Sequence, residues 1–270
     1  MNIQRTPRRL IAALAVVAFV AVSCGSDDDS SDAASTSVAS DETAASSETT
    51  DAMTEGTEPS AADATTPPAT EAPTTEPAAM FEGDLVGTFS IDDAVCDSAE
   101  VSGSYFRMLQ PGGSVTDGPF IPNADSACVD TTYTGLTAGT DDGLVTGAYQ
   151  PAPDPAFDEA GNGLADAIFA PVPFFAVAFA GATDPAETMP TLSATDGVLT
   201  GDLSAFTAYY GASSFNQGAP KPDGAGEAPT GTIDPETGAY VLDWTSQIVG
   251  GSFNDFVGVW HLEGTFTPNS

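Results

Sequence analysis

Two stretches near the C-terminus alternate apolar and polar side chains, and this alternation limits the possible folds more than any other feature. The even positions of residues 239–249 include Tyr240, Leu242, Trp244 and Ile248. Residues 256–266 repeat the pattern with Phe256, Trp260, Leu262 and Phe266. A period of two places successive side chains on opposite faces of a β-strand. The two stretches therefore predict neighbouring strands of an antiparallel sheet with one buried and one solvated face.

The rest of the chain from Phe81 onward is also predicted to be rich in strands. Short apolar or alternating runs are interrupted by Gly, Pro, Asn and Asp, and none keeps a helical period. Further strands are expected at residues 85–91, 105–110, 144–149, 174–179 and 198–210, with turns at residues 111–113, 141–143 and 234–238. The predicted fold class is all-β, a single antiparallel β-sandwich or barrel.

The N-terminus has the features of an export signal. Three arginines precede the uncharged run 10–22, which is shorter than the ~20 apolar residues that a membrane-spanning helix needs. The residues Ala21-Val22-Ser23-Cys24 follow, and this arrangement resembles the signal of bacterial lipoproteins. The resemblance implies that residues 1–23 are removed and that Cys24 is lipidated. It also implies a location at the cell membrane, anchored by lipid on the extracytoplasmic face.

Residues 24–80 separate the expected anchor from the folded part of the chain. They consist mainly of Ser, Thr, Ala, Pro, Asp and Glu, with no aromatic and no basic residue. Such a segment buries too little apolar surface to offset the entropy lost on ordering. We expect a disordered tether over residues 24–80 and one globular domain over residues 81–270, which is long enough to form a core.

The chain is strongly acidic. It has 39 acidic and five basic residues, and removal of the leader leaves only Arg107 and Lys221 as basic residues, for a formal charge of −37. Such a charge repels nucleic acid and anionic lipid headgroups and attracts cations. A nucleic-acid partner is therefore excluded, and the simplest role of the acidic surface is solubility.

Two cysteines remain once Cys24 is assigned to lipid. Cys96 and Cys128 form an even pair in a chain expected to be exported, so we predict a disulfide between them. The alternative is a metal site with two thiolates. Neither a CxxC spacing nor an accompanying histidine supports that alternative.

One segment has the spacing of a calcium-binding loop. Asp158, Asn162 and Asp166 place oxygen ligands at positions one, five and nine, with Gly163 at the expected bend. Ala160 occupies a ligand position, and Phe169 stands where the bidentate glutamate of an EF-hand belongs. The alternative is an ordinary Asn-Gly turn with solvated acids. Calcium bound here would have a structural role.

Catalytic chemistry has little support in this chain. His261 is the only histidine, and its strand places it beside Glu263 on the solvated face. The chain has no GxSxG, HExxH, P-loop or dinucleotide motif. A solvated or locally hydrogen-bonded histidine is therefore favoured over a catalytic one. No catalytic residue and no cofactor-binding residue is predicted.

Several segments resemble parts of a group of uncharacterised exported bacterial proteins rich in β-structure. The segments are residues 240–251, Phe253-Asn254, residues 260–264, residues 141–147, Asn162-Gly163-Leu164 and residues 215–218. The resemblance covers most of residues 85–266. It implies membership of such a group and no particular activity.

These features favour a non-enzymatic, lipid-anchored cell-surface protein that serves as an interaction or envelope module, with an unidentified protein or glycan partner. One alternative is a carrier of a small apolar ligand, held near Phe174, Phe175 and Phe179 in the apolar run 168–180. A large apolar pocket would favour that alternative, and a filled core would remove it. The other alternative is a hydrolase of envelope polymers that uses His261 and neighbouring acids.

Overall fold

A computed structural model describes residues 81–98, 100–222 and 225–269 of the chain. The expected signal peptide, the lipidation site at Cys24 and the tether over residues 24–80 lie outside the described residues, so these stay predictions. In the described part no helix is long and apolar enough to cross a membrane.

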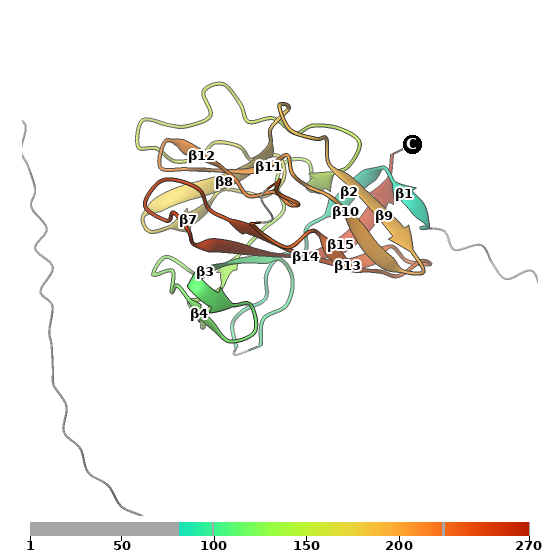
Figure 1. The fold of residues 1–270 in the computed structure, drawn as a ribbon, viewed down its shortest axis with the longest axis horizontal. Helices are drawn as coiled ribbons and strands as arrows, with labels where there is room; N and C mark the ends of the chain where they lie inside the picture. The colour runs from blue at the N-terminus through green and yellow to red at the C-terminus, as the bar shows by residue number, and fades with distance from the viewer. Residues whose placement is uncertain (1–80, 99, 223–224, 270) are drawn as a thin grey trace, which may run out of the picture. The chain divides into compact units, whose positions relative to one another are not determined.

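The described chain folds into two antiparallel sheets (Figure 1). The larger sheet consists of β1 (Gly83–Leu85), β2 (Gly87–Ser90), β3 (Tyr105–Ser114), β4 (Gly118–Phe120), β5 (Thr134–Gly135), β6 (Gly143–Val145), β9 (Thr191–Thr195), β10 (Val198–Asp202), β13 (Thr230–Ile233), β14 (Ala239–Gln247) and β15 (Val257–Pro268). The smaller sheet consists of β7 (Val172–Phe174), β8 (Val177–Thr183), β11 (Phe206–Tyr210) and β12 (Ser213–Asn216). The prediction of an all-β antiparallel fold is confirmed.

The hairpin of β14 and β15 is the centre of the larger sheet and has the predicted faces. Leu242 pairs with Leu262 and Trp244 pairs with Trp260, and all four side chains are buried. Asp243 pairs with His261 on the opposite face. The free edge of β15 pairs with β3 along its first half and with β2 along its last residues. The larger sheet therefore branches at β15.

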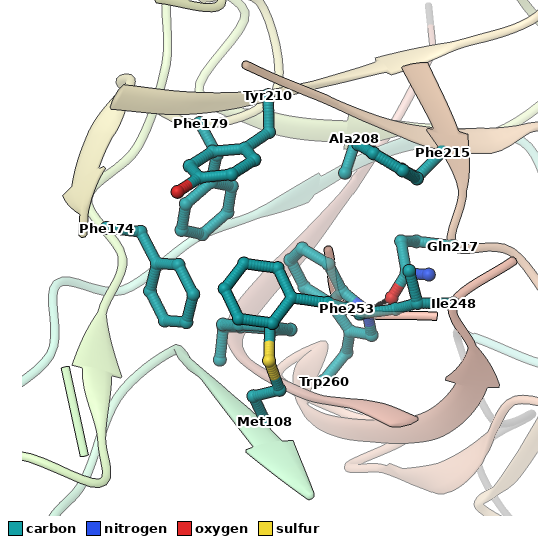
Figure 2. A pocket seen from close by; sticks show the side chains of 11 residues that line it. Met108, Phe174, Phe179, Ala208, Tyr210, Phe215, Gln217, Ile248, Phe253 and Trp260 are labelled. Atoms are coloured by element: carbon teal, nitrogen blue, oxygen red, sulfur yellow. Dashed lines mark hydrogen bonds between the residues drawn. The ribbon is translucent and has the colours of Figure 1, made fainter. Parts of the chain in front are cut away.

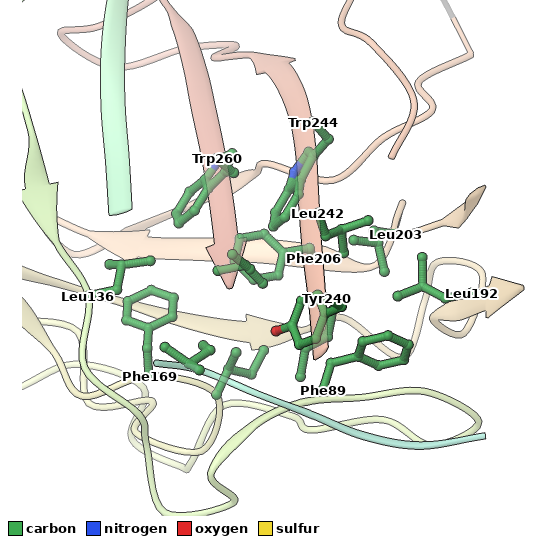
Figure 3. Packing of buried hydrophobic residues seen from close by; sticks show 14 of the residues in the cluster. Phe89, Leu136, Phe169, Leu192, Leu203, Phe206, Tyr240, Leu242, Trp244 and Trp260 are labelled. Atoms are coloured by element: carbon green, nitrogen blue, oxygen red, sulfur yellow. The ribbon is translucent and has the colours of Figure 1, made fainter. Parts of the chain in front are cut away.

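The core lies between the two sheets and is mainly aromatic. Trp244 and Trp260 stack with their ring centroids 5.7 Å apart and an interplanar angle of 7°. Phe206 from β11 of the smaller sheet meets both indoles edge-on, at 5.3 and 4.8 Å (Figure 3). Edge-to-face aromatic contacts of this kind add to the stabilisation from buried area alone.

The opposite face of the smaller sheet is covered by irregular chain. Ala165 packs against Ala180 and Ala182 of β8, and the N–H of Gly163 donates to the carbonyl of Ala178 at 2.9 Å. A Cβ added at Gly163 would lie 2.4 Å from the carbonyl oxygen of Tyr209. Glycine at this position therefore allows the loop to lie directly on the sheet.

Four strand and turn predictions were wrong. Of residues 144–149, only the first two are in a strand, because β6 ends at Val145. Residues 174–179 are not one strand, because Phe175 and Ala176 form the turn between β7 and β8. Residues 198–210 contribute β10 to the larger sheet and β11 to the smaller one. Residues 111–113 lie within β3, and the turn follows at residues 115–117. The predicted turns at 141–143 and 234–238 connect strands as expected.

The disulfide between Cys96 and Cys128 is present, as predicted. It joins segments on either side of β3 and β4, and the carbonyl of Cys96 also accepts the N–H of Val129 at 3.0 Å. Cys128 is buried. The bond therefore links the chain just before β3 to the chain just after β4.

Candidate functional site

A pocket with a cavity volume of about 50 Å³ lies between the two sheets (Figure 2). The surface of the cavity is apolar, although two of its lining residues, Gln217 and Tyr210, have side chains that end in polar groups. The lining residues are Phe106, Met108, Phe174, Phe179, Ala208, Tyr210, Phe215, Gln217, Ile248, Phe253 and Trp260. Seven of these eleven side chains are aromatic.

Strand alternation explains how both sheets contribute to the pocket. Phe106 and Met108 lie two residues apart on β3, so both point to the inner face of the larger sheet. Ala208 and Tyr210 have the same spacing on β11 of the smaller sheet. Trp260 of β15 also lines the pocket, and its ring centroid lies 4.7 Å from that of Phe106. The pocket is thus a gap in the packing between the two inner faces.

Gln217 is the polar group buried at the wall of this pocket, with only 2% of its surface exposed. Its Nε2 donates to the carbonyl of Asn216 at 3.1 Å, and its Oε1 accepts from Trp260 Nε1 at 3.4 Å, which is long for a hydrogen bond. A Cβ added at Gly258 of β15 would lie 2.1 Å from this Oε1. Glycine at 258 therefore leaves the space that the carboxamide occupies.

Two phenylalanines stand at the mouth of the pocket. Phe253 belongs to the loop between β14 and β15 and contacts Phe174, Phe175 and Tyr210, with ring centroids 5.9, 5.7 and 6.2 Å away. Phe175 is 41% exposed and lies in the turn between β7 and β8. The two side chains come from opposite sheets and meet over the entrance.

The turn that carries Phe175 has an unusual backbone. Phe175 and Ala176 have φ values of 49° and 62°, a region that favours glycine or asparagine, so this turn is strained. A carboxylate oxygen of Asp125 accepts the N–H of Ala176, and the carboxamide of Asn123 donates to the carbonyl of Pro173 at 3.0 Å. Contacts from a distant loop therefore hold the turn in place. Burial and the nearby charge of Asp125 raise the pKa of Tyr210.

The basic side chains of Arg107 and Lys221 do not line this pocket. The guanidinium carbon of Arg107 lies 3.3 Å from the ring centroid of Phe120 and 4.1 Å from that of Tyr133. Lys221 donates to the carbonyl of Asn216 at 3.0 Å and to the carbonyl of Gln247. The pocket therefore has no basic group in its lining.

The apolar run proposed to form a pocket wall contributes part of this site. Phe174 and Phe179 line the pocket, and Phe175 lies at its mouth rather than in its wall. Gln217, Tyr210 and Phe253 were not predicted as site residues. The alternation in β11 would place Tyr210 on one face, but nothing in the local pattern around Gln217 or Phe253 indicates a pocket.

His261 lies between two carboxylates, away from this pocket. Its Nδ1 is 2.7 Å from Asp243 Oδ1 and its Nε2 is 3.0 Å from Glu263 Oε1. The Tyr105 ring stacks on the imidazole with centroids 4.5 Å apart, and Glu263 Oε2 accepts the N–H of Gly103 at 2.8 Å. Both ring nitrogens donate in the protonated form, so neither is placed to take a proton from a nucleophile. The interpretation as a locally hydrogen-bonded histidine fits this geometry.

The stability of the protein is expected to fall as pH rises above neutrality. Burial lowers the pKa of His261, but its hydrogen bonds to the carboxylates of Asp243 and Glu263 and the charges of these groups raise it more, so its folded pKa lies above the ordinary value. A raised folded pKa stabilises the protein fully below about pH 6.5, and that contribution disappears as pH rises through the folded pKa. Urea unfolding between about pH 6 and pH 9 measures this change.

Because the chain has a single histidine, His261→Gln provides a direct control. The variant should lose most of the pH dependence in this range. Parallel curves for the variant and the unaltered protein would contradict the assignment. Asp243→Asn, which removes the partner of Nδ1, should reduce the dependence by a smaller amount.

The predicted calcium ligands are brought together only in part. Asp158 Oδ1 accepts the N–H groups of Ala160 and Asn162, and Asp158 Oδ2 accepts Asn162 Nδ2 at 2.8 Å. Asn162 Oδ1 accepts the N–H of Ala178 on β8 at 2.8 Å, so it faces the sheet. These hydrogen bonds lower the pKa of Asp158, the bond from the Asn162 side chain having the largest effect.

The main-chain carbonyl of Asp166 accepts from the N–H of Thr140 at 2.7 Å and from the Thr140 hydroxyl at 3.3 Å. The bend expected at Gly163 is instead at Gly161, whose φ is 86°. Among residues 81–98, 100–222 and 225–269, no group of three or more His, Cys, Asp or Glu side chains is placed to hold a metal ion. The calcium site, which also uses Asn162, stays a prediction.

No protein-family model matches the chain, and searches of the curated proteins and of the solved structures found no match. The resemblance to exported bacterial proteins and to lipoproteins therefore stays a prediction. The geometry of the pocket is the observation on which a function can be based.

Proposed function

We propose that this protein is a non-enzymatic binding module of the cell surface, anchored by lipid on Cys24, which holds a small apolar molecule between its two sheets. The observation that carries the proposal is the aromatic pocket. Pockets lined mainly by apolar and aromatic side chains are typical of small-molecule sites. The acidic surface and the tether keep the domain in solvent, away from an anionic membrane face.

The size of the cavity sets how a ligand would enter. A volume of about 50 Å³ is smaller than the ~150 Å³ cavity that accepts benzene in an engineered protein core. A ring-sized ligand therefore requires a side chain at the mouth to move. Phe253 is suited to this, because its loop contains Gly250, Gly251 and Asp255 at positive φ and its ring is only partly buried.

Filling the pocket should abolish binding of an apolar probe. Ala208 is buried on β11 with its side chain toward the cavity, and valine suits a strand, so Ala208→Val narrows the space with little change in the backbone. We expect a loss of at least about tenfold in affinity, or about 1.4 kcal/mol, for the neutral fluorescent probe phenylnaphthylamine. The measurement is the rise in fluorescence on titration.

The titration uses residues 24–270 with Cys24→Ser, so that the chain has neither the apolar leader nor the lipid and needs no detergent. Ala239→Val is the matched control, since Ala239 is exposed on β14 and does not line the pocket. The control should bind the probe like the parent chain. Equal affinity for Ala208→Val and the parent would place the probe elsewhere and contradict the pocket as the site.

The anchor has an independent test. Mass spectrometry of the mature N-terminus should find Cys24 as the first residue with diacylglycerol on its sulfur, as the lipoprotein resemblance implies. Cys24→Ala should lose the diacylglycerol, because no thiol remains at this position to carry it. An unmodified Cys24 in membranes would contradict lipid anchoring.

A further inference from the structure

We propose that the pocket selects flat aromatic molecules that are neutral or cationic. This inference rests on the proposed function and specifies the class of ligand. Two independent observations carry it: the geometry of the rings around the cavity and the distribution of charge.

The rings around the cavity are arranged to pack against another ring. Phe174 meets Phe179 at 89°, Phe106 at 73° and Phe253 at 66°, with centroids 6.0, 5.8 and 5.9 Å apart. These edge-to-face contacts place ring edges and ring faces around the same space. An aromatic ligand continues this arrangement and gains ~0.5–1.5 kcal/mol per contact beyond area burial, which an aliphatic ligand of equal size does not.

The negative charge of the protein determines which ligand charge the pocket favours. The chain without its leader has a formal charge of −37, and neither Arg107 nor Lys221 lines the pocket. Asp125 lies beside the mouth, where its carboxylate accepts the N–H of Ala176. Burial, and to a smaller extent the charge of Asp125, raises the pKa of Tyr210 in the pocket wall. A carboxylate or sulfonate on the ligand would therefore be repelled. A cationic group would be attracted by this field and by the faces of the aromatic rings.

Two pairs of probes test the proposal on the Cys24→Ser chain. Phenylnaphthylamine and anilinonaphthalene sulfonate share one ring skeleton and differ in the negative group, so the neutral probe should bind at least about tenfold more tightly. Naphthol and decanol have the same number of carbon atoms and a hydroxyl each. Naphthol should displace phenylnaphthylamine at a concentration at least about tenfold lower than decanol.

The outcomes separate this inference from the proposed function. No binding of phenylnaphthylamine by the parent chain would overturn the pocket as a ligand site. Binding of the probe with equal displacement by decanol and naphthol would overturn aromatic selectivity and leave the apolar site in place. Equal affinity for the neutral and the sulfonated probe would overturn the charge argument.

Discussion

Trp260→Ala is expected to lower the free energy of unfolding by about 3–5 kcal/mol, the range for removing a fully buried large aromatic side chain. Trp260 is 1% exposed and lies where the two sheets meet. Its ring stacks on Trp244 of the same sheet and contacts Phe206 and Phe179 of the smaller sheet, with centroids 4.8 and 6.1 Å away. Its loss would remove contacts within the larger sheet and between the sheets.

Such a loss is a large share of the total stability of a domain, which is about 5–15 kcal/mol. Urea unfolding measures it, with Val249→Ala as the control, because Val249 is 68% exposed and its truncation should change stability by no more than about 0.5 kcal/mol. A decrease below about 1 kcal/mol for Trp260→Ala would contradict the view that this indole joins the sheets.

The same variant also enlarges the pocket, since Trp260 is one of its lining residues. Addition of indole should restore part of the lost stability, because a ligand that binds only the folded state raises the apparent stability. Recovery of the melting temperature with indole, and not with an aliphatic alcohol of similar size, would connect this prediction with the aromatic selectivity proposed for the unaltered pocket.

The C-terminal hairpin could be predicted from the sequence because its information is local. Tyr240, Leu242 and Trp244 alternate with polar residues, and a period of two specifies both the strand and its buried face. The branching of the larger sheet at β15 could not be predicted in this way. The pairing of β15 with β3 and β2 joins segments more than 140 residues apart. The alternation of side chains within one strand does not indicate which distant strand it pairs with.

The run 174–179 shows why one strand prediction failed. Its apolar residues have no turn signal, yet Phe175 and Ala176 adopt positive φ because Asp125, about 50 residues earlier, holds the N–H of Ala176. A tertiary contact overrides the local preference here. The candidate site was predicted only in part for the same reason. Phe174 and Phe179 belong to a recognisable apolar run, whereas Gln217 and Phe253 reach the pocket through the packing of distant segments.

Replacing both Cys96 and Cys128 with serine is expected to lower the free energy of unfolding by about 3–4 kcal/mol. The bond links residues with a sequence separation of 32, and a loop of this length gives this value on the chain-entropy model. Urea unfolding of the double variant, and of the parent chain with and without a reductant, measures the loss. Equal stability of the oxidised and reduced parent chain would contradict the prediction.

The effect of the disulfide should extend to the pocket, because of what its loop carries. Asn123 and Asp125 lie between the two cysteines and hold the turn between β7 and β8 through Pro173 and Ala176. Without the disulfide, the segment that carries Asn123 and Asp125 is held less firmly, and the strained turn between β7 and β8 should open more often. Hydrogen exchange at the Ala176 amide should therefore accelerate more than exchange in β14. Uniform acceleration across both sites would show that the disulfide stabilises the whole domain without a particular role at the mouth of the pocket.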